Sequence, residues 1–208
     1  MDKLPKIVVM VSGSGTNLQA ILDAVESGRI TAVISLVVSN RQAAYGLVRA
    51  QEAGIPTLYF PLKPYRDAGK SRDQYDHDLA ERIMNHNPDL IVLAGWMHVL
   101  SPAFLDTFPD RVINLHPALP GAFAGVNAIE RTFTAFQQGS EKDGGCMVHY
   151  VVPEVDAGAT IVQEVVPIYE TDTLQDFEAR LHEAEHRIIV EAIRRCSVNA
   201  SVQSTKER

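Results

Sequence analysis

The feature that most constrains the fold is a strict alternation of two kinds of segment over the first 115 residues. Short apolar runs rich in β-branched residues are typical of buried parallel strands, and we expect strands at 7–11, 33–38, 57–60, 90–94 and 112–115. Segments with helical spacing lie between them, at 16–27, 43–53 and 71–85, and a short helix begins at Ser101-Pro102. This order predicts a doubly wound α/β domain with a mostly parallel sheet.

The pattern changes after about residue 140. Two β-rich runs, Cys146–Val152 and Ala159–Pro167, are joined by a long turn, which predicts a β-hairpin. A final helix is expected over Thr173–Arg195, where Thr173 and Asp176 have the spacing of a capping box. We therefore expect a single domain over residues 1–196, a Rossmann-like core with a C-terminal β-hairpin and final helix, followed by a flexible tail at 197–208.

Composition and charge exclude several classes of protein. Apolar residues make up 46% of the 208 residues and charged residues 22%, which is typical of a soluble globular protein. No apolar run is long enough to cross a bilayer, no signal peptide is evident, and two distant cysteines do not suggest a disulfide framework. We expect a cytoplasmic protein that binds neither membranes nor, with a net charge of −7 and no basic stripe, nucleic acid.

A glycine-rich loop lies between the first expected strand and helix, where residues 12–17 read Ser-Gly-Ser-Gly-Thr-Asn. Small residues let the backbone approach a ligand, and the free N–H groups of a helix start favour an anion. Leu18 replaces the third glycine of a dinucleotide fingerprint, and the lysine of a Walker A loop is missing. The loop suits a single phosphate group; the alternative is a tight turn that needs glycine only for its geometry.

Two polar residues, Asn114 and His116, end the fifth expected strand. Ligands of open α/β sheets bind at the carboxyl ends of strands, and alternation puts both side chains on one side. An amide can donate to the oxyanion of an acyl transfer, and an imidazole can move a proton. Asp156 or Glu154, in the hairpin turn, could orient the imidazole and favour its charged form. Two satisfied polar residues at a strand end remain the alternative.

A zinc-peptidase pattern, His-Glu-x-x-His, occurs at residues 182–186. On a helical wheel both histidines lie on the flank of the apolar face and Glu183 faces solvent. Few residues follow that could supply a third ligand. We therefore expect no metal here, and Glu185, close to the apolar face, is better placed for a pocket.

Four motifs occur in the order and spacing of phosphoribosylglycinamide formyltransferases, and the chain resembles that family from about Lys6 to Arg195. They are Ser-Gly-x-Gly-Thr-Asn at 12–17, Leu-Ala-Gly-Trp-Met at 93–97, Ile-Asn-Leu-His-Pro at 113–117, and Val-His-Tyr with Glu-Val-Asp-Ala-Gly within 148–158. The resemblance implies the formyltransferase fold. It also implies transfer of the formyl group of 10-formyltetrahydrofolate, as co-substrate, to the amine of glycinamide ribonucleotide in de novo purine biosynthesis. Residues 118–121, and His98 where many relatives carry arginine, depart from the family pattern.

The resemblance also implies roles for single residues. The catalytic residues would be Asn114, His116 and Asp156, with His149 nearby. The ribonucleotide would be held by Gly15, Thr16 and Asn17 at its phosphate and by Glu185. The folate site would be lined by Arg72, Met97, His98, Val99, Leu100, Val152 and Glu154. The partners would be the two small substrates only, in a monomer or homodimer without a metal.

Two kinds of alternative remain. Other enzymes of this fold use formyltetrahydrofolate, but methionyl-tRNA formyltransferases carry an extra C-terminal β-domain, and formyltetrahydrofolate hydrolases carry an N-terminal regulatory domain. A non-catalytic sensor of phosphate ligands would need the glycine loop but not Asn114, His116 and Asp156 together.

Overall fold

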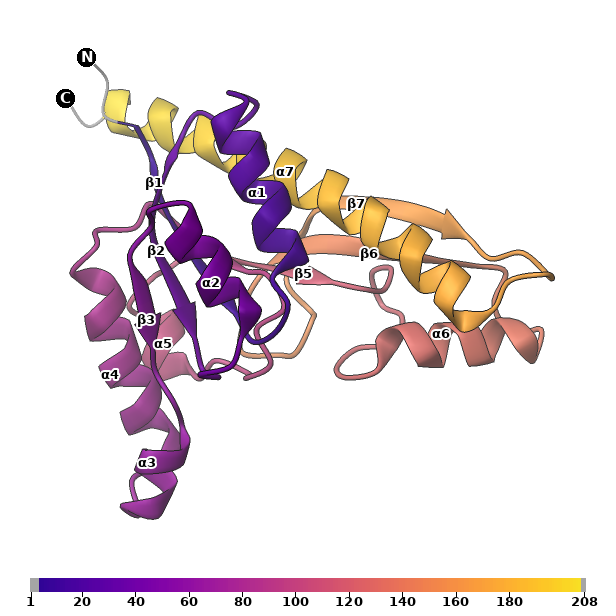
Figure 1. The fold of residues 1–208 in the computed structure, drawn as a ribbon, viewed down its shortest axis with the longest axis horizontal. Helices are drawn as coiled ribbons and strands as arrows, with labels where there is room; N and C mark the ends of the chain where they lie inside the picture. Colours follow the sequence, from indigo (N-terminus) through magenta and orange to yellow (C-terminus); the bar gives the residue numbers. More distant parts are fainter. Residues whose placement is uncertain (1–3, 207–208) are drawn as a thin grey trace.

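The computed structural model describes residues 4–206, and the side chains of residues 4–197. One seven-stranded sheet has the order β3-β2-β1-β4-β5-β6-β7 (Figure 1). The strands from β3 to β5 are parallel, whereas β6 is antiparallel to β5 and β7 to β6. The α/β fold with a mostly parallel sheet and a C-terminal hairpin is therefore confirmed. The strands are β1 Lys6–Val11, β2 Val33–Ser39, β3 Thr57–Tyr59, β4 Leu90–Leu93, β5 Val112–His116, β6 Asp143–Tyr150 and β7 Thr160–Pro167.

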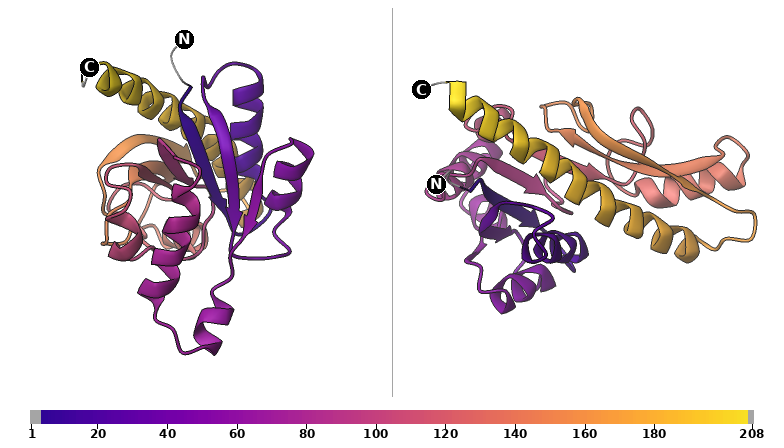
Figure 2. Two further views of the ribbon diagram at one scale, coloured as in Figure 1. Left: turned by 90° about the vertical axis from the view of Figure 1, so that its left-hand side faces the viewer. Right: turned by 90° about the horizontal axis from the view of Figure 1, so that it is seen from above.

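Helices cover both faces of the sheet (Figure 2). Alternate residues of β1 enter two different cores: Val9 packs with α1, α2 and α7 side chains, whereas Met10 packs with those of α4 and α5. Burial on both faces explains why the parallel strands are continuous apolar runs. The long helix α7 crosses α1 and the hairpin (Figure 1). The helices are α1 Thr16–Glu26, α2 Tyr45–Glu52, α3 Lys63–Asp67, α4 Arg72–Met84, α5 Pro102–Leu105, α6 Ala128–Gln137 and α7 Leu174–Lys206.

Two helices begin with a side-chain cap, whereas Ser101, expected at the start of α5, makes no capping hydrogen bond. Ser71 caps α4 by accepting from the Gln74 backbone N–H, and the Gln74 side chain accepts in return from the Ser71 N–H. Before α7, Asp176 accepts from the Thr173 N–H and donates its own N–H to the Thr173 hydroxyl. Such caps satisfy backbone donors that the helix itself leaves unpaired.

Two helices were not expected from the sequence. The five residues of α3 are too few to show a helical period. The start of α6 carries no side-chain cap, because Asn127 enters the helix in a left-handed conformation with a φ of 55°. The last helix also continues to Lys206, past the expected end at Arg195. The single domain over 1–196 and the flexibility of residues 197–208 stay predictions.

From β1 to β3 successive strands are added on one side of β1, and from β4 onwards they are added on its other side. The candidate site lies where this order changes, between β1 and β4. The loops after β1, β4 and β5 all leave the carboxyl edge of the sheet there, where open α/β sheets bind ligands. In the described part of the chain, no helix is both long and apolar enough to span a membrane.

Candidate active site

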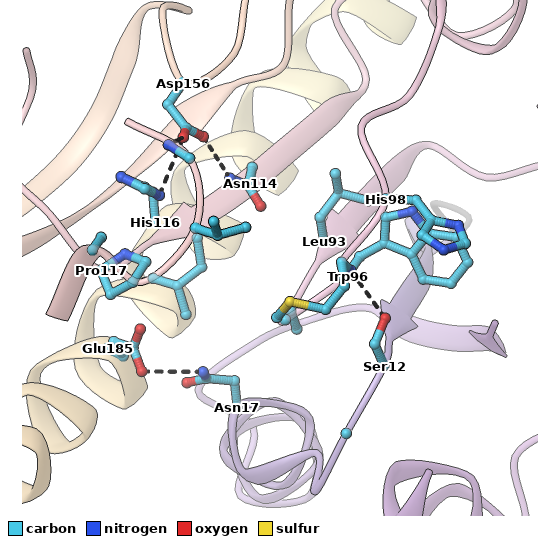
Figure 3. A pocket seen from close by; sticks show the side chains of 18 of the residues that line it. Ser12, Asn17, Leu93, Trp96, His98, Asn114, His116, Pro117, Asp156 and Glu185 are labelled. Atoms are coloured by element: carbon cyan, nitrogen blue, oxygen red, sulfur yellow. Dashed lines mark hydrogen bonds and ion pairs between the residues drawn. The ribbon is translucent and has the colours of Figure 1, made fainter. Parts of the chain in front are cut away.

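A cleft of about 580 Å³ opens at this edge of the sheet. The loops after β1, β4 and β5 line it, together with the β6–β7 turn and one face of α7. Figure 3 shows Asn17 and Glu185 in one group, with Asn114, His116 and Asp156 in a second and Ser12, Trp96 and His98 in a third. Asn114 and His116 both face the cleft, as alternation along the strand predicted.

The glycine loop is held from behind by the start of α2. Gly46 donates its N–H to the Gly13 carbonyl at 3.1 Å, and the Arg49 Nε–H donates to the Ser14 carbonyl at 2.9 Å. Gly15 has a φ of 72°, and a Cβ atom there would lie 2.7 Å from the Gly46 Cα. Glycine is thus required by the fold at Gly15, while the same loop also faces the cleft.

A buried carboxylate, Glu185, closes the cleft beside this loop. It is 5% exposed and accepts from the Asn17 Nδ2 at 3.4 Å and from the His182 Nδ1 at 2.7 Å. The hydrogen bond to Glu185 raises the pKa of His182, more than burial lowers it. Asn17, Glu185 and His182 therefore form a connected polar group at the α1–α7 contact.

Asp156 lies at the centre of the second group. Its Oδ2 is 3.4 Å from the His116 Nδ1 and accepts the Gly125 N–H at 2.9 Å. Its Oδ1 is 3.3 Å from the Asn114 Nδ2 and 3.4 Å from the His149 Nε2. The turn can bring Asp156 this close because Gly158 packs on the Tyr150 carbonyl, where a Cβ atom would lie at 1.7 Å.

Burial and charge act in opposite directions on this group. Burial raises the pKa of Asp156, but contacts with His149 and the Gly125 N–H outweigh burial and hold the pKa below its usual value. Burial also lowers the pKa of His116, and the opposing effects of Asp156 and of the Phe123 carbonyl do not reverse it. As expected, Asp156 acts to raise the pKa of His116, but burial has the larger effect and the pKa stays below its usual value.

The hydrogen-bonding capacity of the catalytic candidates is largely used within the protein. The His116 Nε2–H donates to the Phe123 carbonyl at 3.2 Å, so both ring nitrogens of His116 face acceptors. The His149 Nδ1–H donates to the Tyr150 carbonyl, which leaves Nε2 to accept from the Asn114 amide at 3.3 Å. The two bonds of the Asn114 Nδ2 are longer than usual, so a stronger acceptor can compete for them.

The third group joins the glycine loop to the segment after β4. The Ser12 hydroxyl accepts the Met97 N–H and donates to the Asn40 Oδ1. The Asn40 amide is 3.0 Å from the His98 Nε2, which must then be the acceptor, so the proton of the neutral ring lies on Nδ1. Burial, and then the charge of Arg72, lower the pKa of His98 and favour that neutral ring.

Not all expected folate-site residues line the cleft. Met97, His98, Val99, Leu100 and Val152 do. Arg72 lies behind them, where it donates to the Val99 carbonyl and to the buried Asp76. Glu154 is exposed in the turn and is not among the lining residues. Arg72 thus supports the segment rather than faces the cleft.

Comparison with known proteins decides the family. The formyl transferase family model matches residues 5–193. A phosphoribosylglycinamide formyltransferase of Schizosaccharomyces pombe is 50% identical over 195 residues, covering 90% of this chain and 94% of the relative. The chain belongs to the phosphoribosylglycinamide formyltransferase family. The enzyme of that name from Escherichia coli is 40% identical over 182 residues, covering 88% of this chain and 82% of the relative.

Solved structures of this family share the fold. The crystal structure of glycinamide ribonucleotide transformylase 1 from Symbiobacterium toebii superposes with a TM-score of 0.87 at 42% identity. The match covers 94% of this chain and 89% of that chain. The family assignment, which the four motifs predicted, is therefore confirmed.

Several residues at this formyltransferase site were not found from the sequence. His182 lines the cleft although it belongs to the discounted His-Glu-x-x-His pattern. Asn40 and Phe123 belong to no motif, and the fold alone brings them into hydrogen-bonding contact with His98 and His116. The discounted pattern contained the clue for His182, because His182 and Glu185 are one helical turn apart.

The histidine pattern does not form a metal cluster. His182 donates to Glu185, and Glu183 is exposed on the other side of the helix. Among the described residues, the one group spaced to hold a metal is His77, Asp78 and Glu81 on α4, and exposed polar groups of this kind are common without an ion.

Proposed function

We propose that this chain transfers the formyl group of 10-formyltetrahydrofolate to the amine of glycinamide ribonucleotide, giving formylglycinamide ribonucleotide and tetrahydrofolate. The observation that carries the proposal is the convergence of Asn114, His116 and Asp156 between a phosphate-type loop and an apolar segment. Both cysteines are free thiols, as suits an enzyme of the reducing cytoplasm. Membership of the family supports the identity of both substrates.

The reaction is an acyl transfer between two nitrogens. The neutral amine attacks the formyl carbon, a C–N bond forms, and the carbonyl oxygen becomes an oxyanion. The amine nitrogen must then lose a proton, and N10 of the folate must gain one before its bond to the formyl carbon breaks. The site therefore has to stabilise one oxygen and to move one proton between two nitrogens.

The second group of residues suits both tasks. An oxyanion can take over one long hydrogen bond of the Asn114 amide, and a charged His116 imidazole, held between the Phe123 carbonyl and Asp156, can stabilise its negative charge. In comparable sites such a donor contributes about 3 kcal/mol. Asp156, ionised because its pKa is low, attracts the proton that the attacking amine releases. Its contacts with both His116 and Asn114 make it the shared element of the two tasks.

Three residues that line the cleft each have one buried polar atom without a partner in the described part of the chain. The Asn17 Oδ1, the Trp96 Nε1 and the His98 Nδ1 are buried without a partner among the described residues. Buried polar atoms of this kind normally have a partner, so a bound ligand is one reason for leaving them open. We propose that Asn17 acts at the ribonucleotide, and Trp96 and His98 at the folate side.

A two-substrate assay tests the function. Purified protein is mixed with 10-formyltetrahydrofolate and glycinamide ribonucleotide, and both tetrahydrofolate and formylglycinamide ribonucleotide are quantified. We expect the two products in equal amounts and no turnover when the ribonucleotide is left out.

Other outcomes would replace the proposal. Formate and tetrahydrofolate formed without the ribonucleotide would indicate a hydrolase. Formylation of methionyl-tRNA in place of the ribonucleotide would indicate the other transferase. Ligand binding without any turnover would leave only a sensor of phosphate ligands.

A further inference from the structure

The 117–127 loop after β5 touches both central catalytic candidates through its backbone. Its Phe123 carbonyl accepts from the His116 Nε2–H at 3.2 Å, and its Gly125 N–H donates to the Asp156 Oδ2 at 2.9 Å. These two contacts fix opposite sides of the His116–Asp156 pair. The orientation of the pair therefore depends on the position of this loop.

The loop cannot hold that position by local preference alone. Phe123 has a φ of 40° and Asn127 a φ of 55°, a region that side chains other than glycine rarely occupy. Gly121 and Gly125 also have positive φ values, of 79° and 84°. A segment with this backbone needs support from its surroundings, since non-glycine residues in this region are strained.

One side chain, Arg131 on α6, supplies support at two adjacent points. Its Nη1–H donates to the Ala124 carbonyl at 2.8 Å. Its guanidinium also lies over the Phe123 ring, with Cζ 5.4 Å from the ring centroid, within the range of a cation–π contact. Arg131 thus contacts Phe123, whose carbonyl accepts from His116, and Ala124, which precedes the Gly125 N–H bound to Asp156.

We propose that Arg131 is a positioning residue for formyl transfer, which holds the 117–127 loop so that its backbone orients His116 and Asp156. Arg131 does not line the cleft, so it acts through the loop and not on a substrate. The inference rests on the proposed function, because it concerns the step that His116 and Asp156 carry out.

The pH dependence of turnover gives a signature of this role. The Phe123 carbonyl raises the pKa of His116 against the effect of burial, so loss of that contact lowers the pKa further. His116 carries a positive charge and a transferable proton only in its imidazolium form, so the alkaline limb of the kcat profile should move to lower pH. The other titratable groups facing His116 are Asp156 in the turn, His149 on β6 and Glu185 on α7. Of these, Asp156 is the one whose carboxylate accepts from the loop, at the Gly125 N–H, and because Asp156 raises the pKa of His116, its displacement would also lower that pKa.

The test compares Arg131→Met with Arg194→Met, a control that removes an exposed arginine paired with Glu191 on α7. We expect Arg131→Met to lower kcat about tenfold, with both KM values within about threefold, since small misplacements of reacting groups cost this much or more. The alkaline limb should move to lower pH in this variant alone. Arg131→Lys, which keeps a cation and a donor, should recover most of kcat.

Several results would overturn the inference. One is that Arg131→Met has the same kcat and pH profile as Arg194→Met. Another is that Arg131→Met raises a KM and leaves kcat unchanged. If Arg131→Met fails to fold, Phe123→Leu is tested instead, because it keeps the Phe123 carbonyl and removes only the ring. An unchanged kcat and pH profile in Phe123→Leu would also refute the positioning role of Arg131. Wild-type protein is assayed alongside, because absent wild-type turnover would refute the proposed function and not the role of Arg131.

Discussion

Two loops enclose the two ends of the cleft, and they are built in different ways. The glycine loop at residues 12–15 is held by α2 through the Gly46 N–H and the Arg49 side chain, and Gly15 is packed directly against the Gly46 backbone. The 117–127 loop is longer, and the side chain of Arg131 supports it. The first end is therefore sensitive to an added Cβ atom, whereas the second depends on a few side-chain contacts.

The largest effect is expected from Asp156→Asn, which keeps the shape of the side chain and removes its charge. Because Asp156 touches both His116 and Asn114, kcat should fall by at least about 100-fold while both KM values stay within a few-fold. Steady-state kinetics measure this. Removal of the carboxylate also removes an effect that raises the His116 pKa, so an NMR titration should show a lower pKa for this imidazole.

Asp172→Asn provides the control for that variant. Asp172 pairs with Arg180 away from the cleft, so its loss should leave kcat unchanged. Near-full kcat in Asp156→Asn would reduce Asp156 to a turn residue. The proton path would then run elsewhere, with Glu154 and His149 as the next candidates.

The next effect is expected at the other end of the cleft, from Gly15→Val. The new Cβ would lie 2.7 Å from the Gly46 Cα, so the loop must move, and the KM for glycinamide ribonucleotide should rise at least about tenfold. The KM for the folate should change little. Gly28→Val is matched, with a φ of 74° and no atom within 4 Å of the added Cβ. Equal weakening of both substrates would count against a phosphate role for the loop.

A smaller effect concerns His182, whose pKa is raised by its hydrogen bond to Glu185. An imidazole with a raised pKa stays positively charged at pH values below this pKa, and it becomes neutral over the pH interval around the pKa. If the charged imidazole attracts the phosphate, the KM for the ribonucleotide should rise a few-fold over that interval, and His182→Gln should abolish the change. His77→Gln, on the exposed face of α4, is the control. An identical KM profile in His182→Gln would exclude His182 from phosphate binding.

The smallest effect is expected from metal removal. His182 is engaged with Glu185, and Glu183 faces away from it, so the His-Glu-x-x-His pattern has no open set of ligands. Activity should survive extended dialysis against a chelator, measured as kcat before and after treatment. A loss of kcat that zinc restores would show that this interpretation is wrong.

Local signals in the sequence were strong enough to predict most of the core. The apolar runs of β1 and β4 are buried on both faces, so their strand character depends on little but composition. The caps at Ser71 and Thr173 were readable for the same reason, since each joins residues three apart. By contrast, α6 has no side-chain cap, and it was missed.

The candidate site divides in the same way. The sequence by itself determined which residue types face the cleft, because Asn114 and His116 end a strand and the glycines precede a helix. Only the tertiary structure decided that burial lowers the pKa of His116, that Arg72 lies behind the cleft, and that Arg131 supports the loop. Desolvation and contacts between distant segments depend on how elements pack, and no spacing along the chain encodes them.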